Sequence, residues 1–113
     1  MDKKKQLKEE YLKLRPDMGI FSVTNINTGS VYIGCALDLR SGINRMLFQL
    51  SAGIWPGRPL QEEWKKFGKA DFKVETLDRL SYRENDEGFD YLPELNELLL
   101  LWKEKLNTSK PVK

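Results

Sequence analysis

The chain has 113 residues, of which 40% are apolar and 32% charged, with one cysteine and no histidine. This length supports one compact domain, and the absence of histidine excludes Ser-His-Asp and Cys-His nucleophilic sites and imidazole-ligated metal centres. The 19 basic and 17 acidic side chains leave a net charge of +2, which is too small to indicate a nucleic-acid partner by itself.

Cysteine content and hydropathy indicate the cellular setting. A lone Cys35 can form neither an internal disulfide nor a thiolate zinc site, which suits a reducing compartment. The longest apolar run, 98–102, has five residues, against the ~20 that span a bilayer. The N-terminus lacks the apolar segment of a signal peptide. We therefore expect a cytoplasmic protein without membrane contact, and the sequence leaves its oligomeric state open.

The first half of the chain predicts a helix, a β-hairpin and a second helix. Residues 2–14 form a charged helical segment that ends before Pro16, because the residue preceding proline disfavours helical backbone. Residues 19–24 and 30–34 alternate around an Asn/Gly-rich turn, as in a hairpin. A helix follows from an Asp38 cap to a stop at Gly53, with its apolar face made of Leu39, Ile43, Met46, Leu47 and Leu50.

The second half predicts a loop, two helices and a strand. Residues 54–59 form a rigid loop, and a short helix then ends at Gly68. The pattern of residues 71–77 predicts a third strand, and the acidic residues 81–91 form a loop. A last helix opens at Pro93, with one apolar face made of Leu95, Leu98, Leu99, Trp102 and Leu106.

This order of elements predicts an α+β fold. We expect a small three-stranded, mainly antiparallel sheet flanked by helices, with an extra N-terminal helix. The predicted organisation is an N-terminal charged helix (1–17), one domain (18–108) and a basic tail (109–113). Charge is uneven along the chain: residues 38–69 carry six basic and three acidic side chains, whereas residues 82–97 carry one basic and six acidic. Such blocks are usually solvated faces.

The predicted hairpin carries two triplets, Gly19-Ile20-Phe21 and Tyr32-Ile33-Gly34. With the elements that follow, they resemble the GIY-YIG nuclease family, whose signature triplets lie on adjacent strands. Residues 60–68 resemble the family's second helix, residues 72–80 its third strand, and Glu97 the position of its metal-binding glutamate. The resemblance covers residues 18 to about 107 and implies the family's fold and a bacterial or phage setting.

The resemblance implies metal-assisted hydrolysis of a DNA phosphodiester. In the family, signature tyrosines help to activate water, an arginine on the first helix stabilises the phosphorane, and a glutamate holds a divalent ion. A phosphoryl centre that gains negative charge needs a metal and fixed positive charge beside it. Tyr32 and Glu97 fit this pattern, with Mg²⁺ held by Glu97 if the site is active.

Three positions depart from the family's pattern. Gly42 stands where the family has its arginine, Met46 where it often has a histidine, and Phe21 lacks the hydroxyl of the first triplet. Loss of a transition-state arginine in phosphoryl transfer costs roughly 10³ to 10⁵ in rate. Arg45, three residues after Gly42 on roughly the same helix face, is the available substitute.

We therefore expect a GIY-YIG-fold domain whose nuclease site has decayed, which acts by binding nucleic acid or a protein partner and holds no cofactor. One alternative is a Mg²⁺-dependent endonuclease that uses Tyr32, Arg45 and Glu97, and another is a protein–protein interaction module. The simpler interpretations are that Tyr32 packs as an aromatic side chain, Met46 lies in the core and Glu97 edges an amphipathic helix. A candidate phosphate-binding set, or else ordinary solvated charge, consists of Arg40, Arg45, Arg58, Lys65, Lys66 and Lys69.

Overall fold

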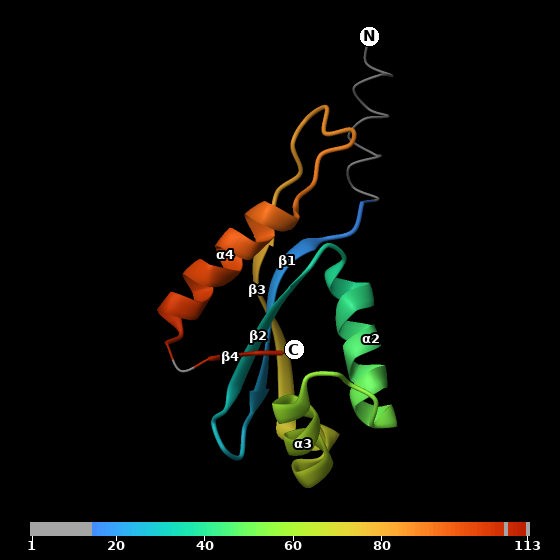
Figure 1. The fold of residues 1–113 in the computed structure, drawn as a ribbon, viewed down its shortest axis with the longest axis vertical. Helices are drawn as coiled ribbons and strands as arrows, with labels where there is room; N and C mark the ends of the chain where they lie inside the picture. The colour runs from blue at the N-terminus through green and yellow to red at the C-terminus, as the bar shows by residue number, and fades with distance from the viewer. Residues whose placement is uncertain (1–14, 108, 113) are drawn as a thin grey trace.

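The computed structural model describes residues 15–107 and 109–112, so the helix predicted over residues 2–14 lies outside the described residues. The described chain forms one sheet with three α-helices (Figure 1). In chain order the elements are β1 (Met18–Asn25), β2 (Val31–Ala36), α2 (Leu39–Ala52), α3 (Arg58–Phe67), a 3₁₀ helix (Lys69–Asp71), β3 (Phe72–Leu80), α4 (Leu92–Lys105) and β4 (Lys110–Pro111).

The sheet has four strands in the order β3-β1-β2-β4, which corrects the predicted three. The central strand β1 pairs antiparallel with both β2 and β3, as predicted. The additional strand, β4, pairs parallel with β2 and places Lys110 beside Tyr32. Because β4 has only two residues, it carries no alternation that would separate a strand from a basic tail.

The third strand is longer than its alternating pattern predicts and ends at Leu80, as the family resemblance implies. A bulge lets it continue, since Ile20 pairs with Asp78 while Phe21 pairs with Thr76, which leaves one residue of β3 unmatched. Helix α3 begins at Arg58, two residues before its apolar pattern, because Pro59 fits the first turn of a helix.

Helix α2 confirms its predicted cap and stop. The Asp38 side chain accepts a hydrogen bond from the Ser41 backbone N–H at 3.0 Å. At the other end, Gly53 has a φ of 77°, a left-handed conformation that glycine adopts without a steric penalty. None of the described helices is both long enough and apolar enough to cross a membrane.

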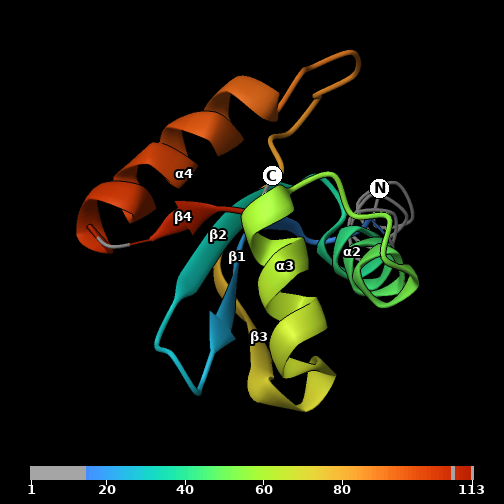
Figure 2. The same cartoon turned by 60° about the horizontal axis from the view of Figure 1, so that its bottom comes forward.

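The sheet separates two clusters of buried side chains, with α2 and α3 on one face and α4 on the other (Figures 1 and 2). The larger cluster lies under α2 and α3 and includes Phe21, Tyr32, Met46 and both Trp55 and Trp64. The smaller one joins Met18, Tyr91 and Leu95 beneath α4. Strand β1 contributes side chains to both clusters, because successive side chains of a strand point to opposite faces of the sheet.

Buried hydrogen bonds join the end of α2, the following loop, α3 and β4. The Gln61 carboxamide accepts from the Trp55 backbone N–H at 2.8 Å and donates to the Leu50 carbonyl at 3.0 Å. The Trp55 indole in turn donates to the Val112 carbonyl at 2.8 Å. The C-terminal segment is thus fixed against the domain, and the Val112 side chain lies in the larger core cluster.

Candidate functional site

A hollow of about 420 Å³ is bordered by β1, β2, α2, the middle of α4 and the C-terminal segment. It is bordered by all three positions that depart from the family's pattern, Phe21, Gly42 and Met46. The structure therefore brings these separated residues together, at the place where the resemblance puts the reaction. Met46 and Phe21 are themselves buried core residues, so their outer atoms form the floor of this hollow.

We call this hollow the central hollow. Its lining is mainly apolar and includes Leu99 from α4 and Val112 from the C-terminal segment. Its polar side chains are Arg45 and Gln49 on α2 and the half-buried thiol of Cys35, whose pKa is raised by burial. Its full lining is Phe21, Ile33, Gly34, Cys35, Ala36, Gly42, Arg45, Met46, Gln49, Trp55, Leu99, Pro111 and Val112, and this set contains no carboxylate.

Gly42 lies where α2 comes close to the end of β2. An ideal Cβ on this residue would stand 3.1 Å from the Cβ of Ala36, which is a tight but adjustable contact. Glycine therefore allows the close approach of helix and strand, while its cost to the helix is about 1 kcal/mol relative to alanine. Arg45, one turn further along α2, is exposed at the rim of the central hollow.

Tyr32 points away from this hollow. Its ring packs in the larger core cluster, and its hydroxyl donates to Glu63 on α3. The other carboxylate oxygen of Glu63 accepts from the Asn25 amide at 3.0 Å. The outer edge of this group borders a different hollow of about 400 Å³, together with Lys66 and Lys110.

This hydrogen-bonded group shifts two pKa values in opposite directions. Burial, the bond to Glu63 and the charge of that carboxylate raise the pKa of Tyr32 above its ordinary value. Burial opposes ionisation of Glu63, but donation by Tyr32, Asn25 and Thr28 and the charge of Lys110 outweigh it, so the pKa of Glu63 lies below its usual range. Tyr32 is thus a neutral donor that holds a charged Glu63.

Glu97 lies at a third place. It is exposed on α4 and borders a hollow of about 400 Å³ between α4 and β3, with Glu94 and Arg83 beside it. The Arg83 guanidinium forms an ion pair with Glu94 there. Leu99, two residues after Glu97 and so turned by about 200° around the helix, is the residue of α4 that borders the central hollow.

The structure therefore does not bring the candidate catalytic residues together, because Tyr32, Arg45 and Glu97 border three different hollows. The residues present do not fit the divalent ion of the family's reaction. Among the described residues that border the hollow at Glu97, the one other carboxylate is Glu94, and it is paired with Arg83. Among the described residues no cluster of three or more Asp, Glu, Cys or His side chains is arranged to hold a metal. Triplet matching misses this divergence because it ignores which way each side chain faces.

The candidate phosphate-binding residues are all exposed. Arg40 and Arg45 project from α2 and the others from α3 and the 3₁₀ helix, and within the described residues none of the six forms an ion pair. Lys65 lies close to the end of α2, since its Cε is 3.5 Å from where a Cβ on Gly53 would stand. Of the two acidic residues on α3, Glu62 is exposed beside this group, and Glu63 accepts a hydrogen bond from Tyr32.

The arrangement of these elements is similar to that of a solved nuclease domain. The catalytic domain of homing endonuclease I-TevI matches with a TM-score of 0.68 and 22% sequence identity, over 85% of this chain and 98% of that one. The fold is that of a GIY-YIG nuclease domain. A variant of the same I-TevI domain, with one glutamate replaced by alanine, matches with the same TM-score and identity over 86% and 94% of the two chains.

By sequence, no protein-family model and no curated protein matches the chain. The structural similarity therefore confirms the predicted α+β fold and the family resemblance of the fold. At 22% identity, the similarity shows the fold of this chain and does not show that the chain catalyses the nuclease's reaction.

Proposed function

We propose that this chain is a DNA-binding domain with the GIY-YIG fold that does not cleave DNA. The observation that carries the proposal is the lining of the central hollow, which Leu99 borders together with Phe21, Gly42 and Met46; among the described residues that line it, the one charged side chain is Arg45. Such a lining is suited to packing against apolar groups, and it lacks the charges that would stabilise a pentacoordinate phosphoryl transition state.

Cleavage would require several groups to converge on one phosphate. A misplacement of even about 1 Å can cost two orders of magnitude in rate. Here the hydroxyl of Tyr32 already donates to Glu63, and Glu97 borders a hollow on another face of α4. Of the described residues that line the central hollow, only Arg45 supplies positive charge, and none of them is a carboxylate that could bind a metal.

Binding to DNA is supported by the distribution of charge and by the relatives of the fold. The similar solved domain belongs to a homing endonuclease, an enzyme that acts on nucleic acid. Residues 38–69 carry a net charge of +3, since they hold six basic and three acidic side chains, whereas residues 82–97 carry −5 from one basic and six acidic. A duplex would be attracted to the side of α2 and α3 and repelled from the loop before α4.

The test is the salt dependence of affinity for a short DNA duplex, measured by fluorescence anisotropy. We compare the wild type with a triple variant on α3, Arg58→Ala, Lys65→Ala and Lys66→Ala. If these cations contact phosphates, the slope of log K against log salt falls by up to about 3 and affinity drops for every duplex sequence.

A second triple variant serves as the matched control, because it removes the same number of cations elsewhere: Lys73→Ala, Arg83→Ala and Lys103→Ala. It should retain nearly all of the wild-type affinity. Affinity that is independent of salt, or an equal loss in both triple variants, would contradict the proposal and favour a protein partner.

A further inference from the structure

Helix α4 leaves part of its leucine run uncovered. Leu95 is buried against the sheet, but Leu100 and Leu101 are 58% and 62% exposed. Leu98 is half-buried and, with Leu101, borders the hollow between α4 and β3. An apolar strip of this kind on an otherwise charged helix indicates a contact surface.

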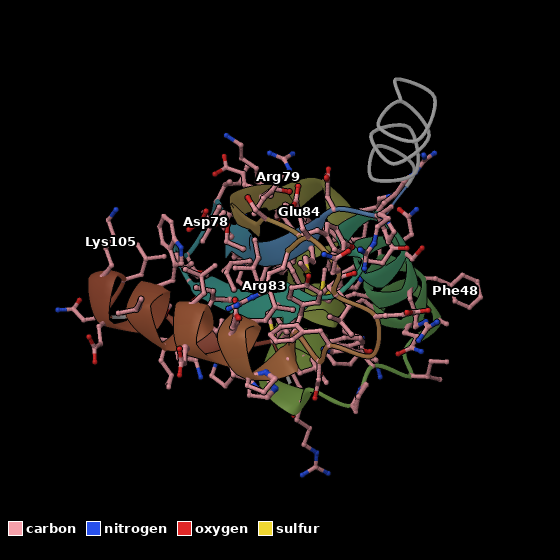
Figure 3. The ribbon with its side chains drawn as sticks, turned by 90° about the horizontal axis from the view of Figure 1, so that it is seen from above. Phe48, Asp78, Arg79, Arg83, Glu84 and Lys105 are labelled. Carbon is pink, nitrogen blue, oxygen red and sulfur yellow. The ribbon has the colours of Figure 1, made fainter. Side chains whose placement is uncertain are left out.

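The strip is bordered by opposite charges at its two ends. Glu94, Leu98, Leu101 and Lys105 follow one another at spacings of 4, 3 and 4 residues, so they lie along one side of the helix. Glu94 lies in the first turn and Lys105 in the last. Figure 3 shows Lys105 at one end of α4, with Arg83, the partner of Glu94, toward the other end.

We call these four residues, Glu94, Leu98, Leu101 and Lys105, the α4 stripe. Their spacings of 4, 3 and 4 residues are the same counted from either end of the helix. If a second α4 lies antiparallel across it, Leu98 faces Leu101 and Glu94 faces Lys105, twice each about a two-fold axis. A surface that complements itself in this way is what an isologous dimer needs. Glu94 can accept from a second cation while it is paired with Arg83, because a carboxylate has several acceptor positions.

We propose that two copies of this chain associate through an antiparallel contact of their α4 stripes. The contact buries Leu101 and the exposed part of Leu98 in both copies and adds two ion pairs between them, whereas Leu100 lies outside the stripe. One helix pair forms a small interface, so we expect a weak and reversible dimer. The surface lies on the face of the sheet opposite α2 and α3, so it is separate from the proposed DNA-binding side.

Sedimentation of the full chain tests the apolar part of the proposal. The weight-average mass of the wild type should rise toward twice the monomer mass between about 1 µM and about 1 mM protein. Leu101→Glu should weaken association by about tenfold or more, since it places a charge at the centre of the contact. Phe48→Glu is the control, because Phe48 is 71% exposed and projects from α2 on the far side of the molecule from α4 (Figure 3).

Charge exchange tests the register. Glu94→Lys alone and Lys105→Glu alone should each associate several-fold more weakly, because each homodimer then opposes like charges twice. An equimolar mixture of the two variants should recover the wild-type association, since both contacts become Lys–Glu pairs in the heterodimer. Thermal unfolding confirms that each variant is folded.

Three outcomes would overturn the proposal. The first is a wild type that stays monomeric to about 1 mM. The second is a Leu101→Glu variant that associates as strongly as the Phe48→Glu control, and the third is a mixture that associates no better than its separate components. None of these measurements involves DNA, so failure here is distinct from failure of the proposed function.

Discussion

At the scale of single residues, the glycines of the two hairpin triplets are required by what packs against them. An ideal Cβ on Gly19 would stand 2.0 Å from the backbone oxygen of Asp78, which lies in the paired strand β3 beside the bulge. A Cβ on Gly34 would meet the Val112 side chain at 2.7 Å and the Phe21 ring at 2.9 Å. These contacts explain the glycines by the packing of the sheet, independently of any reaction.

Tyr32 has a structural role that its mutation can measure. Tyr32→Phe removes the donor to Glu63 and should lower the free energy of unfolding at pH 7 by about 1–3 kcal/mol, because a bond to a charged, partly buried acceptor is lost. Tyr82→Phe is the matched control. Its hydroxyl bonds to the Pro16 carbonyl at a more exposed place, so it should cost about 1 kcal/mol or less in urea unfolding.

The pH dependence of this difference has a definite sign. Because the folded pKa of Glu63 lies below its ordinary value, the stabilisation is fully present above the pKa of the unfolded carboxyl and is lost as the pH falls through the folded pKa. The gap between wild type and Tyr32→Phe should therefore narrow in acid. A gap that stays constant down to about pH 3 would show that the hydroxyl does not act through the Glu63 charge.

At the scale of elements, Gln61 joins the end of α2 to the loop that precedes α3. Gln61→Ala leaves the Trp55 N–H and the Leu50 carbonyl without this partner, and should cost about 3 kcal/mol because both groups are buried there. Glu62→Ala, at the exposed neighbouring position, should change stability by about 0.5 kcal/mol or less. Equal effects of the two substitutions in urea unfolding would contradict this role.

The elements themselves follow from local sequence rules, whereas the site does not. The hairpin, the Asp38 cap, the Gly53 and Gly68 ends of the helices and the Pro93 helix start all arise within a few residues and could be predicted. The strand β4 could not, because its two residues depend on a distant partner in β2.

The candidate site could not be predicted from the sequence, because it depends on the direction in which each side chain points. Tyr32, Arg45 and Glu97 have suitable spacings in the sequence, but whether their side chains converge depends on strand register and helix rotation. The side of α4 that borders the central hollow carries Leu99, whereas Glu97, two residues earlier in the helix, lies on another side. A helical-wheel comparison of α4 with its buried residue Leu95 is the sequence signal that could have indicated this.

At the scale of the whole molecule, the sheet separates two surfaces with different chemistry. The side of α2 and α3 carries the six exposed cations of the candidate phosphate-binding set, and the side of α4 carries the leucine stripe with acidic residues near its start. The proposed DNA-binding surface and the proposed dimer contact therefore lie on opposite faces of the sheet.

Cleavage of supercoiled plasmid with Mg²⁺ or Mn²⁺ tests the central claim most directly. We predict that the wild-type chain, at concentrations that shift the plasmid in a gel, produces no nicked or linear DNA beyond the protein-free control. Cleavage that both Arg45→Ala and Glu97→Ala abolish, while each variant remains folded and still binds the plasmid, would contradict the account.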